Sequence, residues 1–176
     1  MAERNPSLLA AIDAARRIAI IGSPGAGKST LARALAARTG LPLVHLDQLH
    51  WRAGWTAPPE PEWQARVRAA AEGERWIIDG NYGTTLAPRL ARAELVLWLD
   101  PPTALCLWRV ATRIAGQWGR VRADMAPGCP ERLDWRFLRY VACFRRDSRP
   151  ALVAEVERAA GRVFVIRGGR TPPLAS

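Results

Sequence analysis

Lysine is almost absent from this 176-residue chain. Of its 26 basic residues, only Lys28 is a lysine, and the others are arginines. Guanine-specific nucleotide switches read their base with an Asn-Lys-x-Asp motif, and Lys28 stands in a different sequence, so that class of protein is excluded. A single lysine indicates a chemical need for a compact ammonium on a thin stem, which a planar guanidinium does not replace.

Cysteine and long apolar runs are scarce as well. The three cysteines, Cys106, Cys129 and Cys143, are widely spaced without a Cys-x-x-Cys pair, so neither a disulfide framework nor a zinc site is indicated. No apolar run approaches the roughly 18 residues that span a bilayer, and the start of the chain lacks a signal peptide's apolar centre. We therefore expect no membrane segment, a cytoplasmic location and one domain over residues 1–176.

The single lysine lies in a complete G-x-x-x-x-G-K-[ST] phosphate-binding loop, or P-loop. The loop reads Gly22-Ser23-Pro24-Gly25-Ala26-Gly27-Lys28-Ser29-Thr30. Its glycines let backbone N–H groups surround phosphate oxygens, and the helix that follows adds its positive end. In this motif the lysine bridges the β- and γ-phosphates and the serine hydroxyl ligates Mg²⁺. The loop therefore predicts binding of a nucleoside triphosphate, with ATP and Mg²⁺ as the expected cofactors.

Five short apolar runs alternate with helical patterns along the chain. The runs cover residues 17–22, 43–46, 76–78, 95–99 and 162–166, and the later helical patterns include one over 131–146. This alternation predicts an α/β fold of three layers, the P-loop NTPase fold, with a five-stranded parallel sheet and helices on both faces. Ligands gather at the carboxyl ends of such strands. Asp47, Asp79 and Asp100 are expected there, and we favour Asp79 as the carboxylate that assists Ser29 with Mg²⁺.

Positive charge is concentrated in residues 101–150, where ten arginines face four acids, a net charge of +6. Arg109 and Arg113 are four residues apart on one predicted helix, and Arg120 and Arg122 lie in a loop over about 116–130 that holds three glycines and two prolines. Such a loop suits a short hinged lid that shuts out water. Arginines delivered by a lid stabilise the negative charge of phosphoryl transfer. The alternatives are a solvated basic face and a surface that attracts nucleic acid.

Several further motifs resemble one family. They are Leu46-Asp47-Gln48-Leu49-His50-Trp51, Gly54-Trp55, Trp76-Ile77-Ile78-Asp79-Gly80-Asn81-Tyr82, Cys106-Leu107-Trp108-Arg109-Val110, Asp124-Met125-Ala126-Pro127-Gly128-Cys129-Pro130-Glu131 and the segment 145–150. With the phosphate loop, they are similar to the adenylate-kinase-like proteins known as DNA topology modulation proteins. The resemblance covers residues 17–166 and implies the fold of small nucleotide kinases, with an acceptor-binding region at about 47–75 and a mobile lid.

The resemblance also implies where the phosphoryl acceptor binds. Asp47 lies where small kinases hold or deprotonate the acceptor. The residues expected to frame its pocket are His50, Trp51, Trp55, Asn81, Tyr82 and Arg89. Packing within the core or a loop is the alternative for Trp51 and Trp55, and a structural role is the favoured alternative for His50. Adenylate kinases carry Asp-Gly-Phe-Pro-Arg after the third strand, and this chain has Asp79-Gly80-Asn81-Tyr82, without the arginine that grips a nucleoside monophosphate.

The function we predict from the sequence is ATP-dependent phosphoryl transfer. The γ-phosphoryl of Mg·ATP would pass to a nucleotide, a nucleoside or another small acceptor. The first alternative is an ATP-binding protein that acts on nucleic acid, in keeping with the charge of residues 101–150, although no helix-turn-helix, zinc finger or aromatic RNA-binding motif is visible. The second alternative is a plain NTPase, which consumes ATP without forming a phosphorylated product.

Overall fold

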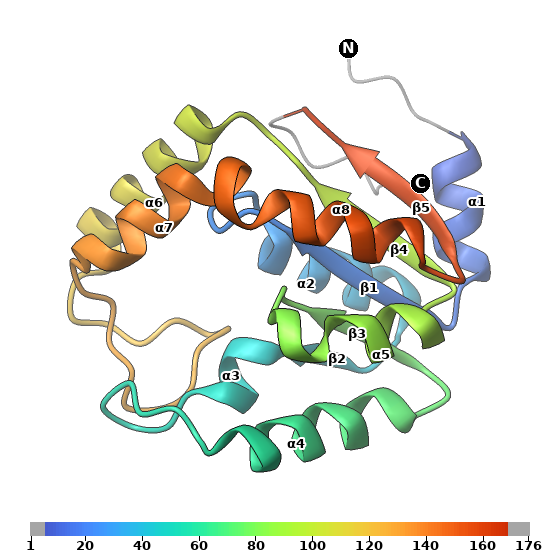
Figure 1. The fold of residues 1–176 in the computed structure, drawn as a ribbon, viewed down its shortest axis with the longest axis horizontal. Helices are drawn as coiled ribbons and strands as arrows, with labels where there is room; N and C mark the ends of the chain where they lie inside the picture. Colours follow the sequence, from blue (N-terminus) through green and yellow to red (C-terminus); the bar gives the residue numbers. More distant parts are fainter. Residues whose placement is uncertain (1–5, 169–176) are drawn as a thin grey trace.

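The chain folds around one parallel sheet with the strand order β2-β3-β1-β4-β5 (Figure 1). A computed structural model describes residues 6–168. The strands are β1 (Arg17–Gly22), β2 (Leu43–His45), β3 (Trp76–Asp79), β4 (Leu95–Leu99) and β5 (Arg162–Ile166). Each neighbouring pair is parallel. All five predicted strands are therefore present, and their carboxyl ends lie at one edge of the sheet.

Helices cover both faces of the sheet. They are α1 (Pro6–Ala14), α2 (Lys28–Thr39), α3 (Leu46–His50), α4 (Glu60–Glu72), α5 (Leu86–Arg92), α6 (Thr103–Gln117), α7 (Trp135–Asp147) and α8 (Arg149–Glu157), with a 3₁₀ turn η1 (Gly83–Thr85). In Figure 1, α5 and α8 lie in front of the sheet and α2 lies behind it. The three-layer α/β fold predicted from the sequence is confirmed.

Alternating residues of the strands build two separate cores. Ile18 and Ile20 of β1 face a core shared with α1, α2 and α6, whereas Ala19 and Ile21 face a core shared with α4, α5 and α8. All four side chains are fully buried. Because β1 is buried on both faces, it appears in the sequence as a continuous apolar run rather than an alternating one.

The region between α6 and α7 differs from its prediction. The helix expected over 131–146 begins only at Trp135, because Asp134 caps it by accepting hydrogen bonds from the backbone N–H groups of Arg136 and Phe137. Glu131 remains extended, since its backbone pairs with Gly119 and Arg120. The helices α1 and α3 were not predicted from the sequence.

From the sequence we expected no membrane segment and no signal peptide. No helix within residues 6–168 is long and apolar enough to cross a membrane. The prediction that no signal peptide is present depends in part on residues 1–5, which lie outside the described residues.

Candidate active site

The phosphate-binding loop joins β1 to α2 at the carboxyl edge of the sheet. Asn81, just past β3, clamps the start of the loop: its Oδ1 accepts from the Gly22 N–H at 2.9 Å, and its Nδ2 donates to the Gly22 carbonyl at 2.8 Å. The Lys28 ammonium donates to the carbonyls of Gly22 and Ser23, each at 3.0 Å. Asn81, which we expected beside the acceptor, therefore also holds the nucleotide loop in shape.

Glycine is required at two positions of this loop. Gly22 has a φ of 137°, and a Cβ built on it would meet the Leu99 carbonyl oxygen at 2.0 Å. Gly25 has a φ of 77°, and its Cβ would meet the Cys106 carbonyl oxygen at 2.5 Å. Residues other than glycine rarely adopt a positive φ. In addition, neither of the two backbone carbonyls can move without disturbing β4 or α6. Both glycines let the loop approach its neighbouring elements closely.

Replacement of Gly22 with alanine is expected to destabilise the protein by on the order of 3 kcal/mol, because backbone strain adds to a clash inside the sheet. Urea unfolding followed by circular dichroism measures the loss. Gly40→Ala is the matched control, since Gly40 also has a positive φ of 67° but its Cβ would meet nothing within 4 Å. Equal losses in the two variants would show that the contact with Leu99 is unimportant.

Acidic side chains surround the ammonium of Lys28. Burial lowers the pKa of Lys28, and the carboxylates of Asp79 and Asp47 act in the opposite direction. Asp79, at the end of β3, is 5% exposed, and its Oδ2 lies 2.9 Å from Nδ1 of His45. The other oxygen, Oδ1, is buried and has no hydrogen-bond partner within residues 6–168. The site therefore holds a buried carboxylate oxygen with unused capacity next to the phosphate loop.

Asp47 lies in the first turn of α3, not at the end of a strand as we expected, because β2 stops at His45. The Tyr82 hydroxyl donates to Oδ1 of Asp47 at 2.6 Å. Burial and the neighbouring Asp47 carboxylate raise the pKa of Tyr82, which keeps this hydroxyl protonated as a donor. Asp47 is thus held in a fixed orientation while it lines the cavity.

Aromatic rings enclose this acidic group. The rings of Trp51 and Trp55 meet edge to face with centroids 5.5 Å apart, and both side chains line the cavity with Tyr82. Trp55 and Tyr82 have positive φ values of 63° and 40°, which are uncommon for non-glycine residues. Such strained backbone is concentrated at functional sites.

Two residues predicted to frame the acceptor pocket lie behind it. Arg89 is fully buried and does not reach the cavity. Its guanidinium donates to the carbonyls of Thr85, Gly80 and Asn81, and burial lowers its pKa to about 9. The structure therefore corrects the expectation that Arg89 contacts the acceptor: Arg89 stabilises the loop after β3.

His50 also supports the site from behind. Its ring packs against the rings of Trp51, Trp63 and Tyr82, with centroids 4.6 to 4.9 Å away. His50 is absent from the walls of the cavity. Burial lowers its pKa against the opposing effect of Asp47 and Glu60. A neutral ring that positions its aromatic neighbours accounts for this residue better than direct contact with a ligand.

The predicted lid, residues 116–130, packs against residues 48–55 of the predicted acceptor-binding region. Met125, Ala126 and Cys129 form a small buried cluster against Trp51 and Trp55. Four hydrogen bonds join the same two segments: Gln48 Nε2 to the Ala123 carbonyl, Gly54 N–H to the Gly128 carbonyl, Trp55 Nε1 to the Pro130 carbonyl, and Cys129 Sγ to the Arg52 carbonyl. The lid and residues 48–55 therefore form one packed unit over the phosphate loop.

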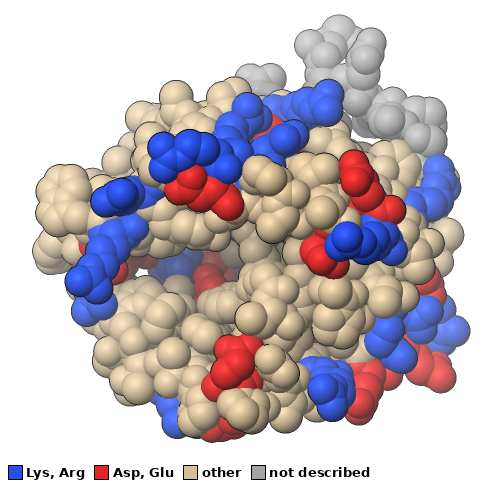
Figure 2. All heavy atoms as spheres, viewed as in Figure 1, with Lys and Arg blue, Asp and Glu red and all other residues tan. Residues whose placement is uncertain are grey.

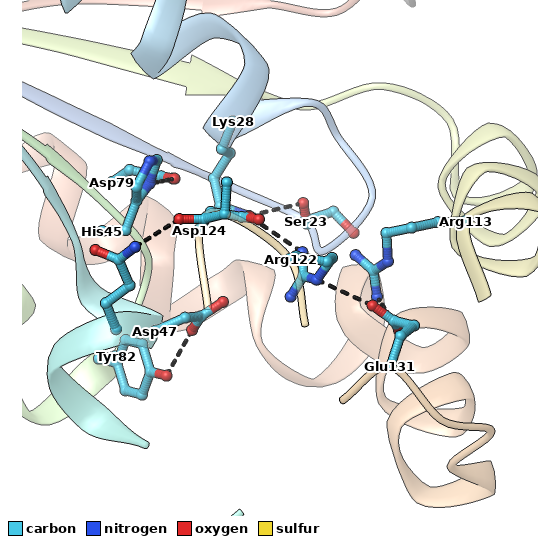
Figure 3. Close-up of polar contacts among 12 residues, drawn as sticks. Ser23, Lys28, His45, Asp47, Asp79, Tyr82, Arg113, Arg122, Asp124 and Glu131 are labelled. Carbon is cyan, nitrogen blue, oxygen red and sulfur yellow. Dashed lines mark hydrogen bonds and ion pairs between the residues drawn. The ribbon is translucent and has the colours of Figure 1, made fainter. Parts of the chain in front are cut away.

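An ion-pair network connects this lid to α6 (Figure 3). Arg113 on α6 contacts Glu131 at 3.1 Å, Glu131 contacts Arg122 at 2.9 Å, and Arg122 contacts Asp124 at 3.1 Å. Burial lowers the pKa of Arg113, as does the like charge of Arg122, while Glu131 opposes the shift. The network thus brings Arg113 and Arg122 together, and acids partly compensate the charge of these two arginines.

One cavity of about 1650 Å³ joins these groups. Figure 2 shows the molecule hollowed between α7 and the α3 region, with basic and acidic side chains visible inside the opening. The predicted residues on its walls are Pro24, Gly25, Gly27, Lys28, Ser29, Thr30, Asp47, Trp51, Trp55, Asp79, Asn81, Tyr82, Arg109, Arg113, Arg120 and Arg122. Pockets for one ligand usually measure about 300–1,000 Å³, so this cavity has room for a nucleotide and an acceptor.

Several residues on the same walls had no predicted role in the site. Tyr140 reaches the cavity from α7, and burial raises the pKa of its hydroxyl. Asp124 enters from the lid, and Glu131 follows the lid directly. Tyr140 lies within the helix expected over 131–146, for which no site residue was predicted, and the roles of the two acids depend on ion pairs between distant segments.

The fold and the loop define the class: this chain is a P-loop NTPase. A family model described as "ATPase family associated with various cellular activities (AAA)" matches residues 18–78, from β1 to β3. The shikimate kinase of Rhodococcus jostii (strain RHA1) is 33% identical over 115 residues, which cover 57% of this chain and 68% of the relative. The chain belongs to the family of that relative, the shikimate-kinase-like P-loop kinases.

Solved structures agree with this fold. Shikimate kinase from Acinetobacter baumannii, in complex with shikimate, has a TM-score of 0.57 at 18% identity, with 94% of this chain and 90% of that chain covered. Shikimate kinase from Aquifex aeolicus has a TM-score of 0.52 at 15% identity, with 89% and 88% covered. At these identities the likeness supports the fold alone. Family membership supports a kinase that acts on a small molecule.

Proposed function

We propose that this chain transfers the γ-phosphoryl group of Mg·ATP to a hydroxyl of a small acceptor, a nucleoside, a nucleotide or a related compound. One observation carries the proposal: the phosphate loop and the Asp47–Tyr82 pair open into the same cavity. A nucleotide on the loop and a hydroxyl beside Asp47 would therefore meet inside one enclosure. The family is one of kinases, and the two-sided cavity is what such a transfer requires.

The nucleotide half of the site is residues 22–30. Backbone N–H groups of the loop and the amino end of α2, a helix of 12 residues, offer positive charge to phosphate oxygens. Lys28 adds a point charge, and its ammonium donates hydrogen bonds to the Gly22 and Ser23 carbonyls of the loop. These groups bind and orient the triphosphate.

The metal site of this proposal consists of Ser29 and Asp79. Within residues 6–168, no three His, Cys, Asp or Glu side chains gather into a group that could hold a metal ion alone. Mg²⁺ usually binds with few protein ligands, several waters and phosphate oxygens. The Oδ1 of Asp79, which has no hydrogen-bond partner among the described residues, and the Ser29 hydroxyl match this mode of binding. When bound, the ion would neutralise charge on the phosphates.

The acceptor half is formed by Asp47, Tyr82, Asn81, Trp51 and Trp55. Asp47 would accept the proton of the attacking hydroxyl, whose oxygen forms a bond to the γ-phosphorus as the bond to the leaving ADP oxygen breaks. Tyr82 keeps the carboxylate in place. The indole rings offer flat apolar surfaces to a ring of the acceptor.

Four arginines complete the cavity on the lid side: Arg109, Arg113, Arg120 and Arg122. Arg109 approaches the phosphate loop most directly, since its Nη1 donates to the Ala26 carbonyl at 3.1 Å. Guanidinium groups in these positions would stabilise negative charge on the group in transfer. In this proposal the chain is one domain, with an acceptor region at 47–75 and a lid at 116–130.

Asp47→Asn is expected to lower kcat by roughly 10²- to 10³-fold, because the proton acceptor is lost. ATP affinity should remain within a few-fold, since Asp47 is outside the phosphate loop. Transfer of label from [γ-³²P]ATP to a panel of nucleosides, nucleotides and sugars measures the first effect, and calorimetry measures the second. Asp13→Asn, a change in a surface ion pair with Arg38, is the control. Undiminished transfer by Asp47→Asn would refute the role of Asp47.

A second candidate function is favoured by one surface feature. Trp118 and Trp135 are 61% and 74% exposed near the lid, beside the exposed arginines Arg132 and Arg136. Aromatic rings with arginines suit single-stranded nucleic acid, in keeping with the resemblance to DNA topology modulation proteins. DNA affinity that falls steeply with salt and does not depend on ATP would support this candidate over the kinase.

A further inference from the structure

His45 is a buried histidine at the carboxyl edge of the sheet, and the proposed transfer gives it no role. Nδ1 of its ring lies 2.9 Å from Oδ2 of Asp79. The two residues are 7% and 5% exposed, and both line the cavity that the phosphate loop also lines. Buried polar groups are stable where they are hydrogen-bonded. Because a carboxylate only accepts hydrogen bonds, the hydrogen of this contact belongs on Nδ1.

The register of the sheet fixes this pair. His45 ends β2 and Asp79 ends β3, and the two residues are partners in neighbouring parallel strands. Side chains alternate between the two faces of a sheet. Leu43 and Ile77, two residues earlier in each strand, belong to the core shared with α2, so His45 and Asp79 point to that face as well. Since α2 begins at the phosphate loop, the pair lies on the side of the sheet where the metal is expected (Figure 3).

The two oxygens of the Asp79 carboxylate have different surroundings. Oδ2 contacts His45, whereas Oδ1 is buried and has no hydrogen-bond partner among the described residues. The Lys28 ammonium, which feels the charge of Asp79, donates hydrogen bonds to the carbonyls of Gly22 and Ser23. An unsatisfied buried acceptor costs free energy unless a ligand pairs with it. The contact with His45 therefore leaves one carboxylate oxygen for a cation in the cavity.

We propose that His45 is a positioning residue of the metal site: its ring N–H holds Oδ2 of Asp79 so that Oδ1 is turned towards Mg²⁺. The last torsion of an aspartate side chain is otherwise broad, and a fixed donor on one oxygen restricts it. Outer-sphere partners orient the ligands of other metal sites in the same way. This inference rests on the proposed function, because it assumes that Asp79 assists Ser29 in binding the metal of Mg·ATP.

The segment that carries His45 also carries the proposed proton acceptor. β2 ends at His45, and Asp47 follows two residues later in the first turn of α3. A shift of this segment would move Asp47 and the hydrogen-bond donor of Asp79 together. The attacking hydroxyl and the metal would thereby keep their relative positions, which transfer within one cavity requires.

The test is the effect of metal on ADP binding, measured by calorimetry on the full chain with ADP alone, with Mg²⁺ and with Mn²⁺. His45→Leu removes the donor and leaves an apolar side chain in its place. This variant is expected to reduce the enhancement of ADP affinity by metal about 10-fold or more, with the affinity for ADP alone little changed. His45→Asn keeps an N–H donor near the position of Nδ1 and should retain most of the enhancement.

The control for packing is Val44→Ala. Val44 is a residue of β2 that packs against the second core and does not line the cavity. Its loss should lower the midpoint of thermal unfolding and leave the effect of metal on ADP binding unchanged. If His45→Leu does not fold, His45→Gln takes its place, because its longer side chain does not reproduce the position of Nδ1.

A double-mutant cycle with Asp79→Asn separates a structural role from the proposed one. If His45 acts through Asp79, His45→Leu has little further effect on metal dependence in the Asp79→Asn background. Unchanged metal dependence in His45→Leu, equal losses in His45→Leu and His45→Asn, or additive losses in the cycle would each overturn the inference. ADP binding that metal does not strengthen would overturn it too, whereas failure of the unmodified protein to bind ADP at all would overturn the proposed function.

Discussion

Lys28→Ala is expected to lower kcat/KM for ATP by at least about 10³-fold while leaving the fold intact. A charged donor that stabilises transferring phosphate contributes on this scale, as single donors and arginines do in related chemistry. The fold should survive because the ammonium donates hydrogen bonds to the Gly22 and Ser23 carbonyls of its own loop. Lys28 belongs to neither hydrophobic core of the sheet, so we expect both cores to remain intact without it.

Lys28→Arg sharpens this prediction. Arginine keeps the charge but presents a planar fork instead of a compact ammonium. We expect its activity to fall nearly as far as that of Lys28→Ala, because the loop is closely packed around its glycines. Steady-state kinetics and thermal unfolding test the two variants together. Activity within tenfold of the unmodified protein in Lys28→Ala would refute the role assigned to the loop.

Arg109→Ala should lower kcat by about 10²- to 10³-fold and change the Kd for Mg·ATP by only a few-fold. The loss falls on kcat because a guanidinium beside the phosphate loop interacts most strongly with charge that develops during transfer. Its hydrogen bond to the Ala26 carbonyl already places it at the loop before any ligand binds. The chain therefore needs little rearrangement to use it.

Comparing kcat with Kd distinguishes this role from simple binding. Arg139→Ala is a suitable control, since Arg139 is an exposed residue of α7 that does not line the cavity. The control should leave both quantities unchanged. Equal losses of turnover and affinity in Arg109→Ala would contradict a transition-state role. They would show that Arg109 contacts the bound nucleotide equally in the ground state.

The parts of the fold that the sequence predicted depend on local patterns. The apolar run Ile18–Ile21 indicates a strand, and the glycines of the phosphate loop that follow it indicate a tight turn. Both signals lie within ten consecutive residues. The same is true of Trp76–Asp79, where a buried strand ends in a carboxylate and a glycine. Each pattern could be interpreted without knowing what lies opposite in space.

The parts that the sequence did not predict depend on contacts between distant segments. The packing of Met125 and Cys129 on Trp51 and Trp55 joins residues at least 70 positions apart. Arg89 was expected to frame the acceptor pocket, yet three backbone carbonyls bind its guanidinium. No spacing in the chain indicates such pairings, since only the folded backbone places those carbonyls around one side chain.

Calorimetric titration of the purified protein with Mg·ATP, or with a non-hydrolysable analogue, tests whether residues 22–30 bind the nucleotide. We expect saturable heat with one nucleotide per chain, and its loss in Lys28→Ala under the same conditions. Absence of heat in the unmodified protein, or an identical isotherm in the variant, would contradict it.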